Sequence, residues 1–125
     1  MMKKPNVIRD KSFDFALRIV KLHKFLIQNN EFVLSKQLLR SGTAVGALVR
    51  EAEHAESKAD FIHKMAIAQK EANECDYWIE LLFRSQYFNE EQFISISTDI
   101  KELNKIIASI IITTKNKQKK LNGNS

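Results

Sequence analysis

Hydrophobic residues recur at every third or fourth position along most of the chain, and this spacing places them on one side of an α-helix. Four stretches carry the pattern, and we expect helices over residues 11–29, 35–54, 57–85 and 89–114. The connections between them are only a few residues long, which forces consecutive helices to lie antiparallel. The pattern therefore predicts one all-α domain, an antiparallel up-down-up-down four-helix bundle.

Polar residues mark the expected ends of these helices. Asn29 and Asn30 would end the first helix, because asparagine tolerates the backbone conformation of a C-terminal cap. Ser35, Ser57 and Asn89 each precede a helical stretch and are expected as N-caps. The sequence thus supplies a boundary signal for each predicted helix.

Each expected helix has an apolar stripe that would face the core. The stripes are Phe13, Ala16, Leu17, Val20 and Ile27; Leu38, Ser41, Val45, Leu48, Val49 and Ala52; Phe61, Met65, Ala68, Ala72, Cys75, Ile79 and Leu82; and Phe93, Ile96, Ile100, Leu103, Ile107, Ile110, Ile111 and Thr114. Cys75 is therefore expected to pack as a small hydrophobic residue rather than act as a nucleophile. A single cysteine excludes an intramolecular disulfide, which fits a cytoplasmic location.

The first and third helices carry a second apolar face opposite the predicted core stripe. Its members are Phe15, Ile19, Leu22 and Leu26 in the first helix and Ile67, Trp78 and Leu81 in the third, with Tyr77 at the margin. A monomer would expose this surface to water, and such patches usually mark an interface. We therefore expect a homo-oligomer that is joined through these seven residues.

Two of the three glycines, Gly42 and Gly46, lie one turn apart in the second helix. A glycine inside a helix costs about 1 kcal/mol relative to alanine. Close approach of another backbone would compensate for that cost, so we expect tight packing here, either within a subunit or between subunits. Glu71 and Glu74 lie at the edge of the second apolar face of the third helix and need partners, for which Arg40 and Arg50 are the candidates.

The net charge of +5 resides in the terminal segments of the chain. Residues 5–114 contain 14 basic and 15 acidic residues, while Lys3, Lys4 and a predicted basic, flexible tail over residues 115–125 supply the excess. The tail lysines are Lys115, Lys117, Lys119 and Lys120. Lysines can bind phosphate through counterion release, and Lys11, Arg18 and Lys21 would add a basic outward face on the first helix. A solvated surface is the alternative.

Three segments together resemble a known family. They are Gln37–Ala47 followed by Glu51-Ala52, then Ala59–Ala68, then Lys70–Leu82. They resemble the bacterial 23S rRNA intervening-sequence proteins, four-helix bundles encoded within large-subunit ribosomal RNA genes. The chain is also distantly similar to the accessory protein of diversity-generating retroelements. Family members often read Ala-Asn-Ile-Ala-Glu-Gly near Gly46–Glu53, and this chain lacks the asparagine and the final glycine.

The resemblance implies a four-helix bundle that assembles as a homopentamer around a central channel. For the ribosomal members it implies no established enzymatic activity, whereas the retroelement relative is a basic pentamer that binds nucleic acid and a reverse transcriptase. On this basis we expect a non-enzymatic scaffold or adaptor whose partners are further copies of itself and RNA, DNA or another protein. A scaffold that binds only proteins is the alternative.

Catalytic motifs are sparse. Arg18 and His23 have the spacing of a pair in certain helical-bundle ribonucleases, so a ribonuclease that uses them is a remote alternative. The angle between them around a helix is about 140°, which does not favour it. No stretch matches a phosphate-binding loop, a nucleotide fingerprint or a zinc cluster. We therefore expect no catalytic residues, no cofactor and no metal. No apolar run is long enough to cross a bilayer, so no membrane association is expected.

Overall fold

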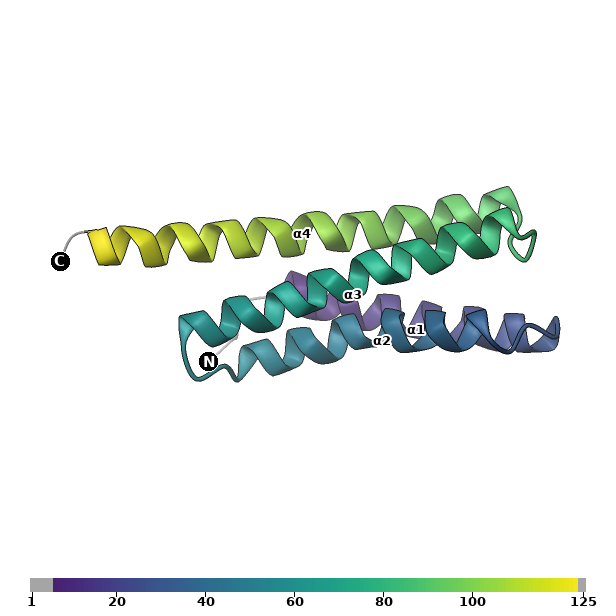
Figure 1. The fold of residues 1–125 in the computed structure, drawn as a ribbon, viewed down its shortest axis with the longest axis horizontal. Coiled ribbons are helices and arrows are strands. Elements are labelled where there is room, and N and C mark those ends of the chain that lie inside the picture. Colours follow the sequence, from purple (N-terminus) through teal and green to yellow (C-terminus); the bar gives the residue numbers. More distant parts are fainter. Residues whose placement is uncertain (1–5, 124–125) are drawn as a thin grey trace.

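The computed structural model describes residues 6–123 of the chain. It contains four helices: α1 (Val7–Gln28), α2 (Leu34–Glu53), α3 (Lys58–Arg84) and α4 (Glu90–Gly123). Figure 1 shows that each helix runs back along the one before it, and the predicted all-α four-helix bundle is confirmed.

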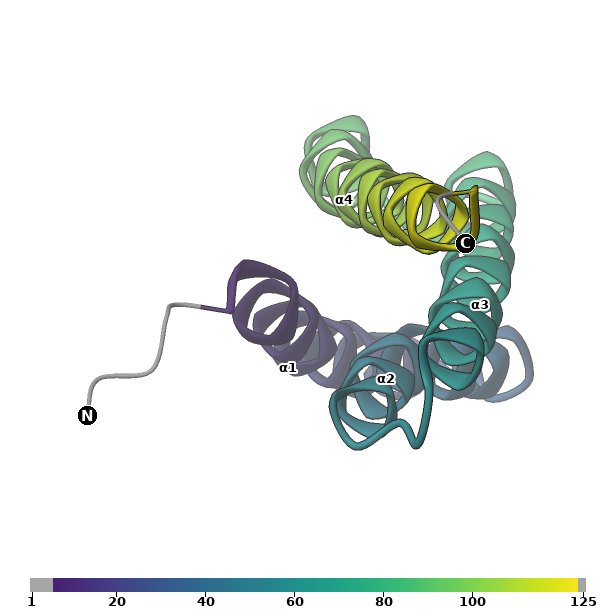
Figure 2. The same cartoon turned by 90° about the vertical axis from the view of Figure 1, so that its left-hand side faces the viewer.

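Helices that are consecutive in the chain pack side by side, which is visible in the view along the bundle in Figure 2. In contrast, α1 and α4 meet over a much shorter stretch. The bundle is therefore closed firmly on three sides and only weakly on the fourth, between its first and last helices.

Side chains cap the starts of α3 and α4 in the way that their local sequence predicts. The Ser57 side chain accepts a hydrogen bond from the Asp60 amide at 3.0 Å. At the start of α4, Asn89 accepts from the Gln92 amide at 2.8 Å, and the Gln92 side chain accepts from the Asn89 amide at 2.9 Å. This is a reciprocal capping box. After α1, Asn30 adopts a positive φ of 63°, which asparagine tolerates, and the chain turns there as expected.

The prediction that Ser35 caps α2 is wrong. The helix begins one residue earlier, Ser35 is fully buried, and the buried Glu31 carboxylate accepts hydrogen bonds from the amides of Val33 and Leu34 instead. A carboxylate at this position also complements the positive end of the helix dipole. Glu31 therefore performs the capping role that the sequence pattern assigned to serine.

The predicted end of the fourth helix at residue 114 is also wrong, because α4 continues to Gly123. Thr114, Gln118 and Leu121 extend the three-and-four spacing of the helix, and lysine and glutamine are good helix formers. Residues 115–123 are thus helical rather than a flexible tail, while residues 124–125 lie outside the described residues, as do Lys3 and Lys4.

The core contains the predicted stripes of α2, α3 and α4, but α1 presents the opposite face. Phe15, Ile19 and Leu26 are at most 2% exposed, whereas Phe13 and Leu17 are about half exposed. The buried stripe of α1 starts one turn earlier than the predicted helix and contains no charged residue: it comprises Ile8, Ser12, Phe15, Ile19, Leu22 and Leu26. The prediction for the faces of α1 was inverted.

The two glycines of α2 pack against α1 within the same chain. A Cβ atom at Gly42 would lie 2.7 Å from Cγ1 of Ile19, and one at Gly46 would lie 3.2 Å from the backbone oxygen of Ser12. Both glycines therefore permit the close approach of α1 and α2. Of the two alternatives left open by the sequence, the structure shows packing within the subunit.

Candidate interaction surfaces

The first uncovered surface is the α1 stripe, which we define as Phe13, Leu17, Val20, Lys24 and Ile27. These positions alternate in steps of four and three, so they follow one line along the helix. Leu17 is 51% exposed and Phe13 is 47% exposed. The Arg50 guanidinium of α2 lies 5.1 Å from the centre of the Phe13 ring. This cation–π contact joins the N-terminal end of the stripe to α2.

The second surface is the α3 stripe, which we define as Ile67, Glu71, Glu74, Trp78 and Leu81. It follows the same spacing, and all five residues are half-buried at the edge where α3 meets α2. The Tyr77 and Trp78 rings meet edge to face, with their centres 5.0 Å apart, and Tyr77 is exposed. The α1 and α3 stripes thus lie on opposite sides of α2.

Arg40 of α2 is held by both carboxylates of the α3 stripe. Its Nη1 lies 3.0 Å from Oε2 of Glu71, and its Nη2 pairs with Oε1 of Glu74. The Trp78 indole N–H also donates to Glu74, at 3.3 Å. The hydrogen bond from Arg40, followed by that from Trp78, lowers the pKa of the Glu74 carboxyl below its usual range. The structure therefore brings together three of the four charged residues that the sequence analysis singled out, and Arg50 lies apart from them.

The predicted interface residues divide into two groups. The predicted role of Phe15, Ile19 and Leu26 as contacts between subunits is wrong, because the chain buries them in its own core, and Leu22 packs against that core as well. Ile67, Trp78 and Leu81 remain half-buried at the surface, on the α3 stripe. Sequence reasoning missed Phe13 and Leu17 as surface residues because both α1 faces have similar apolar content. The charge of Lys24 within the exposed stripe was the available signal.

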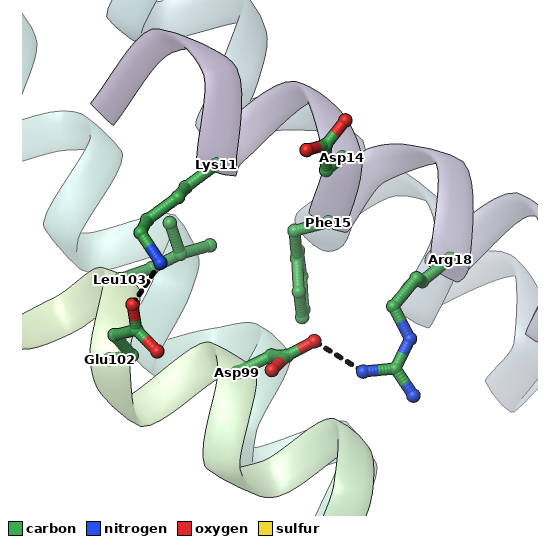
Figure 3. Close-up of a pocket in the computed structure, with 7 residues that line it drawn as sticks. All are labelled: Lys11, Asp14, Phe15, Arg18, Asp99, Glu102 and Leu103. Carbon is green, nitrogen blue, oxygen red and sulfur yellow. Dashed lines mark hydrogen bonds and ion pairs between the residues drawn. The ribbon is translucent and has the colours of Figure 1, made fainter. Parts of the chain in front are cut away.

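Two ion pairs join α1 to α4 across the contact between these helices, which we call the α1–α4 seam. Lys11 pairs with Glu102 and Arg18 pairs with Asp99, while Phe15 lies between the two pairs (Figure 3). Arg18 also donates to the Ser95 hydroxyl at 2.8 Å. The predicted basic outward face of the first helix is therefore wrong for Lys11 and Arg18, whose charges are directed at α4. Lys21 is exposed.

A basic surface lies instead at the C-terminal end of α4. Lys115, Lys117, Lys119 and Lys120 are all exposed on its last turns. Lys117, Lys120 and Leu121 line a shallow hollow together with Lys58, the first residue of α3. Sequence reasoning did not connect Lys58 with these lysines, because more than fifty residues separate them and only the packing of α3 on α4 brings them together.

The residues weighed for catalysis do not form a site. Arg18 is directed at α4, whereas Nδ1 of His23 lies 3.1 Å from the backbone oxygen of Ser35 in α2. Cys75 is fully buried, and burial raises the pKa of its thiol to about 12. Within residues 6–123, no group of three or more His, Cys, Asp or Glu side chains is placed to hold a metal ion. None of the helices described here has the length and apolar character of a membrane span.

Comparison with known proteins agrees with this architecture. The family model of the 23S rRNA-intervening sequence protein matches residues 4–109. A crystal structure from Bacteroides thetaiotaomicron, described as a protein of unknown function from the S23 ribosomal protein family, is 58% identical in sequence and superposes with a TM-score of 0.82. The match covers 83% of this chain and 97% of that one. No curated protein gives a match. The chain therefore belongs to the family of 23S rRNA-intervening sequence proteins.

Proposed function

We propose that the protein is a non-enzymatic, homo-oligomeric scaffold whose copies join through the α1 and α3 stripes. The observation that carries this proposal is the exposure of apolar side chains along the α1 stripe, in a chain whose core is already complete. Contiguous apolar surface of this kind usually marks a protein interface. A second copy of the chain offers a surface of matching length and spacing, the α3 stripe.

The two stripes differ in composition, and this difference determines the kind of assembly. A two-fold dimer brings the same patch of each subunit together, whereas two different patches join head to tail. Head-to-tail contacts close into a ring when the rotation between neighbours fits. Five copies is the ring size that the family resemblance implies. A ring would present the same outer surface several times, which is the property expected of a scaffold or adaptor.

The charges within the stripes favour antiparallel packing between copies. In that register the N-terminal half of the α1 stripe meets Leu81 and Trp78, and Lys24 lies opposite Glu71. Both registers place Val20 opposite Glu74, but parallel packing would also place Leu17 against Glu71 and Lys24 against Trp78, so Lys24 would gain no carboxylate partner. Because a buried charge needs a partner, the antiparallel register is the favourable one.

The molar mass in solution tests the proposal directly. Light scattering coupled to size-exclusion chromatography should give a multiple of 14.5 kDa, and five copies if the ring size is right. Leu17→Asp should reduce the assembly to monomers, because it places a charge in the apolar contact between the α1 stripe of one copy and the α3 stripe of the next. Ile112→Asp is the matched control: Ile112 is 59% exposed on α4, outside both stripes, and its replacement should leave the mass unchanged. A monomeric wild-type protein at high concentration would exclude the scaffold.

Mixing two defective variants tests whether the contact is head to tail. Leu17→Asp leaves the α3 stripe intact, and Leu81→Asp leaves the α1 stripe intact. Each variant alone should be monomeric, but an equimolar mixture should form dimers with one copy of each, because one intact pair of stripes remains. A mixture that stays monomeric, although both variants are folded by circular dichroism, would exclude the pairing of these two stripes.

A further inference from the structure

Among the described residues, the lysines around the α4 end lack the ion pairs that hold several other cations of the chain. Lys11, Arg18 and Arg40 each pair with a carboxylate. Within the described residues, no ion pair involves Lys58 or the four lysines on the last turns of α4. The sequence from Leu103 to Ser125 contains no acidic residue at all, so this part of the chain has no carboxylate of its own to offer them.

Packing of α4 on α3 concentrates this charge rather than dispersing it. Lys117 and Lys120 are three residues apart and therefore share a face of the helix, and this face meets Lys58 across the hollow. Leu121 is the fourth residue of its lining. The nearby carboxylate of Asp60 accepts a hydrogen bond from the Glu56 amide, at 3.2 Å, as part of the turn before α3. Three lysine side chains thus line one hollow, and an anion bound there would offset the repulsion between their charges.

The density of the charge points to the class of anion. Four lysines within six helical residues occupy about 9 Å of helix axis. Duplex nucleic acid carries one negative charge per about 1.7 Å of its axis, so it can engage several of these lysines at once. Lysine acts as a flexible point charge on phosphate, without the bidentate geometry of arginine. None of the four residues lining the hollow is aromatic, so stacking on bases is not expected.

We propose that Lys58, Lys117 and Lys120 form a phosphate-binding site for the backbone of RNA or DNA, with Lys115 and Lys119 extending the contact along α4. Binding is independent of base sequence, because only phosphates are contacted. This site goes beyond the proposed scaffold and does not require it. In a ring, each copy would contribute one such site.

The experiment uses fluorescence anisotropy with a short labelled RNA of mixed sequence, and the same sequence as duplex DNA, at increasing salt concentration. The wild-type protein should bind both, with an affinity that falls steeply as salt increases. The triple variant Lys58→Gln, Lys117→Gln, Lys120→Gln should lower the affinity at low salt at least tenfold and reduce the salt slope by about 1 for each lysine. Lys58→Gln alone should show part of this loss.

The matched control replaces three exposed lysines outside the site, Lys21, Lys36 and Lys105, with glutamine. Its net charge equals that of the site variant, yet it should bind nearly as the wild type does. Equal losses of affinity in both triple variants, or no binding of RNA or DNA by the wild type at low salt, would contradict the proposed site. Stronger binding to vesicles containing anionic lipid than to RNA would show a membrane site instead. Leu17→Asp separates the two proposals. If this variant is monomeric and still binds RNA, the phosphate site does not depend on the ring.

Discussion

At the scale of single residues, one contact determines how closely α1 and α2 approach. Ile19 is fully buried, and its side chain fills the space that a Cβ atom at Gly42 would occupy. Ile19 is also the residue that distinguishes the buried face of α1 from the exposed one. The glycine, which is unfavourable in an isolated helix, therefore has a steric reason to be where it is.

Gly42→Ala should destabilise the fold by up to about 2 kcal/mol, because overpacking costs about 1–3 kcal/mol and the gain in helix propensity returns only about 1 kcal/mol. Urea unfolding followed by circular dichroism measures the difference. Gly123→Ala is the control, since nothing lies within 4 Å of its added Cβ, and it should not lower stability. Ile19→Ala removes both Cγ atoms that would meet the added Cβ, so Gly42→Ala should cost less in an Ile19→Ala background than in the wild type. An equal cost in both backgrounds would mean that the clash lies elsewhere.

The buried thiol of Cys75 makes stability depend on pH. In the native state burial raises its pKa to about 12, whereas its ordinary value is 9.0. Above about pH 9 the unfolded chain loses a proton that the native chain retains, so stability falls as the pH rises. The free energy of unfolding should therefore decrease more between about pH 8 and about pH 10 in the wild type than in Cys75→Ala. Equal slopes for the two proteins would rule out this linkage.

At the scale of helices, the four sides of the bundle are unequal. Glycine and apolar packing join α1 to α2, whereas α1 and α4 are joined by two ion pairs over Phe15 (Figure 3). Arg18 and Asp99 are each about 40% exposed, so their attraction is screened by water and contributes less than about 1 kcal/mol. The seam between α1 and α4 is thus the side of the bundle most easily opened.

Arg18→Ala should increase hydrogen exchange of the facing segments of α1 and α4 severalfold, because it removes one of the two pairs across the seam. Exchange in α2 should change little. High salt should produce the same local effect in the wild type, since it screens exposed charges. Lys21→Ala, on the same helix, serves as the control. Uniformly faster exchange in all four helices would indicate global destabilisation and contradict a local seam.

At the scale of the whole molecule, the chain has two uncovered stripes on opposite sides of α2 and a basic end formed by α3 and α4. Joining the stripes between copies would bury apolar surface without covering the lysines at the α4 end. Assembly and phosphate binding would then use separate parts of the surface. If a ring forms, several basic ends act together, and linked sites bind a long nucleic acid more tightly than one site does.

Assembly should make thermal stability depend on protein concentration, because association stabilises only the folded chain. The wild-type unfolding midpoint should rise as concentration increases, and Ile112→Asp should behave in the same way. The midpoint of Leu17→Asp should stay constant over that range. Scanning calorimetry at several concentrations measures this, and a constant wild-type midpoint would argue against association during unfolding.

The sequence by itself determined the features that depend on residues close together in the chain. Helix existence, the caps at Ser57 and Asn89, and the core faces of α2, α3 and α4 were predictable, because spacing and short-range hydrogen bonds decide them. Each of those three helices has one longest apolar stripe. In the last turns of α4 the hydrophobic spacing is weak, and the predicted end of the helix was therefore too early.

Only the tertiary structure decided which of the two similar faces of α1 is buried, because hydrophobic spacing carries no information about what lies opposite. The fit of Ile19 against Gly42 makes that choice. The tertiary structure also decided that carboxylates of α4 pair with Lys11 and Arg18, and that Lys58 lies beside lysines more than fifty residues away in the sequence. Pairing and clustering of charges depend on distances between helices, and those distances are set by packing.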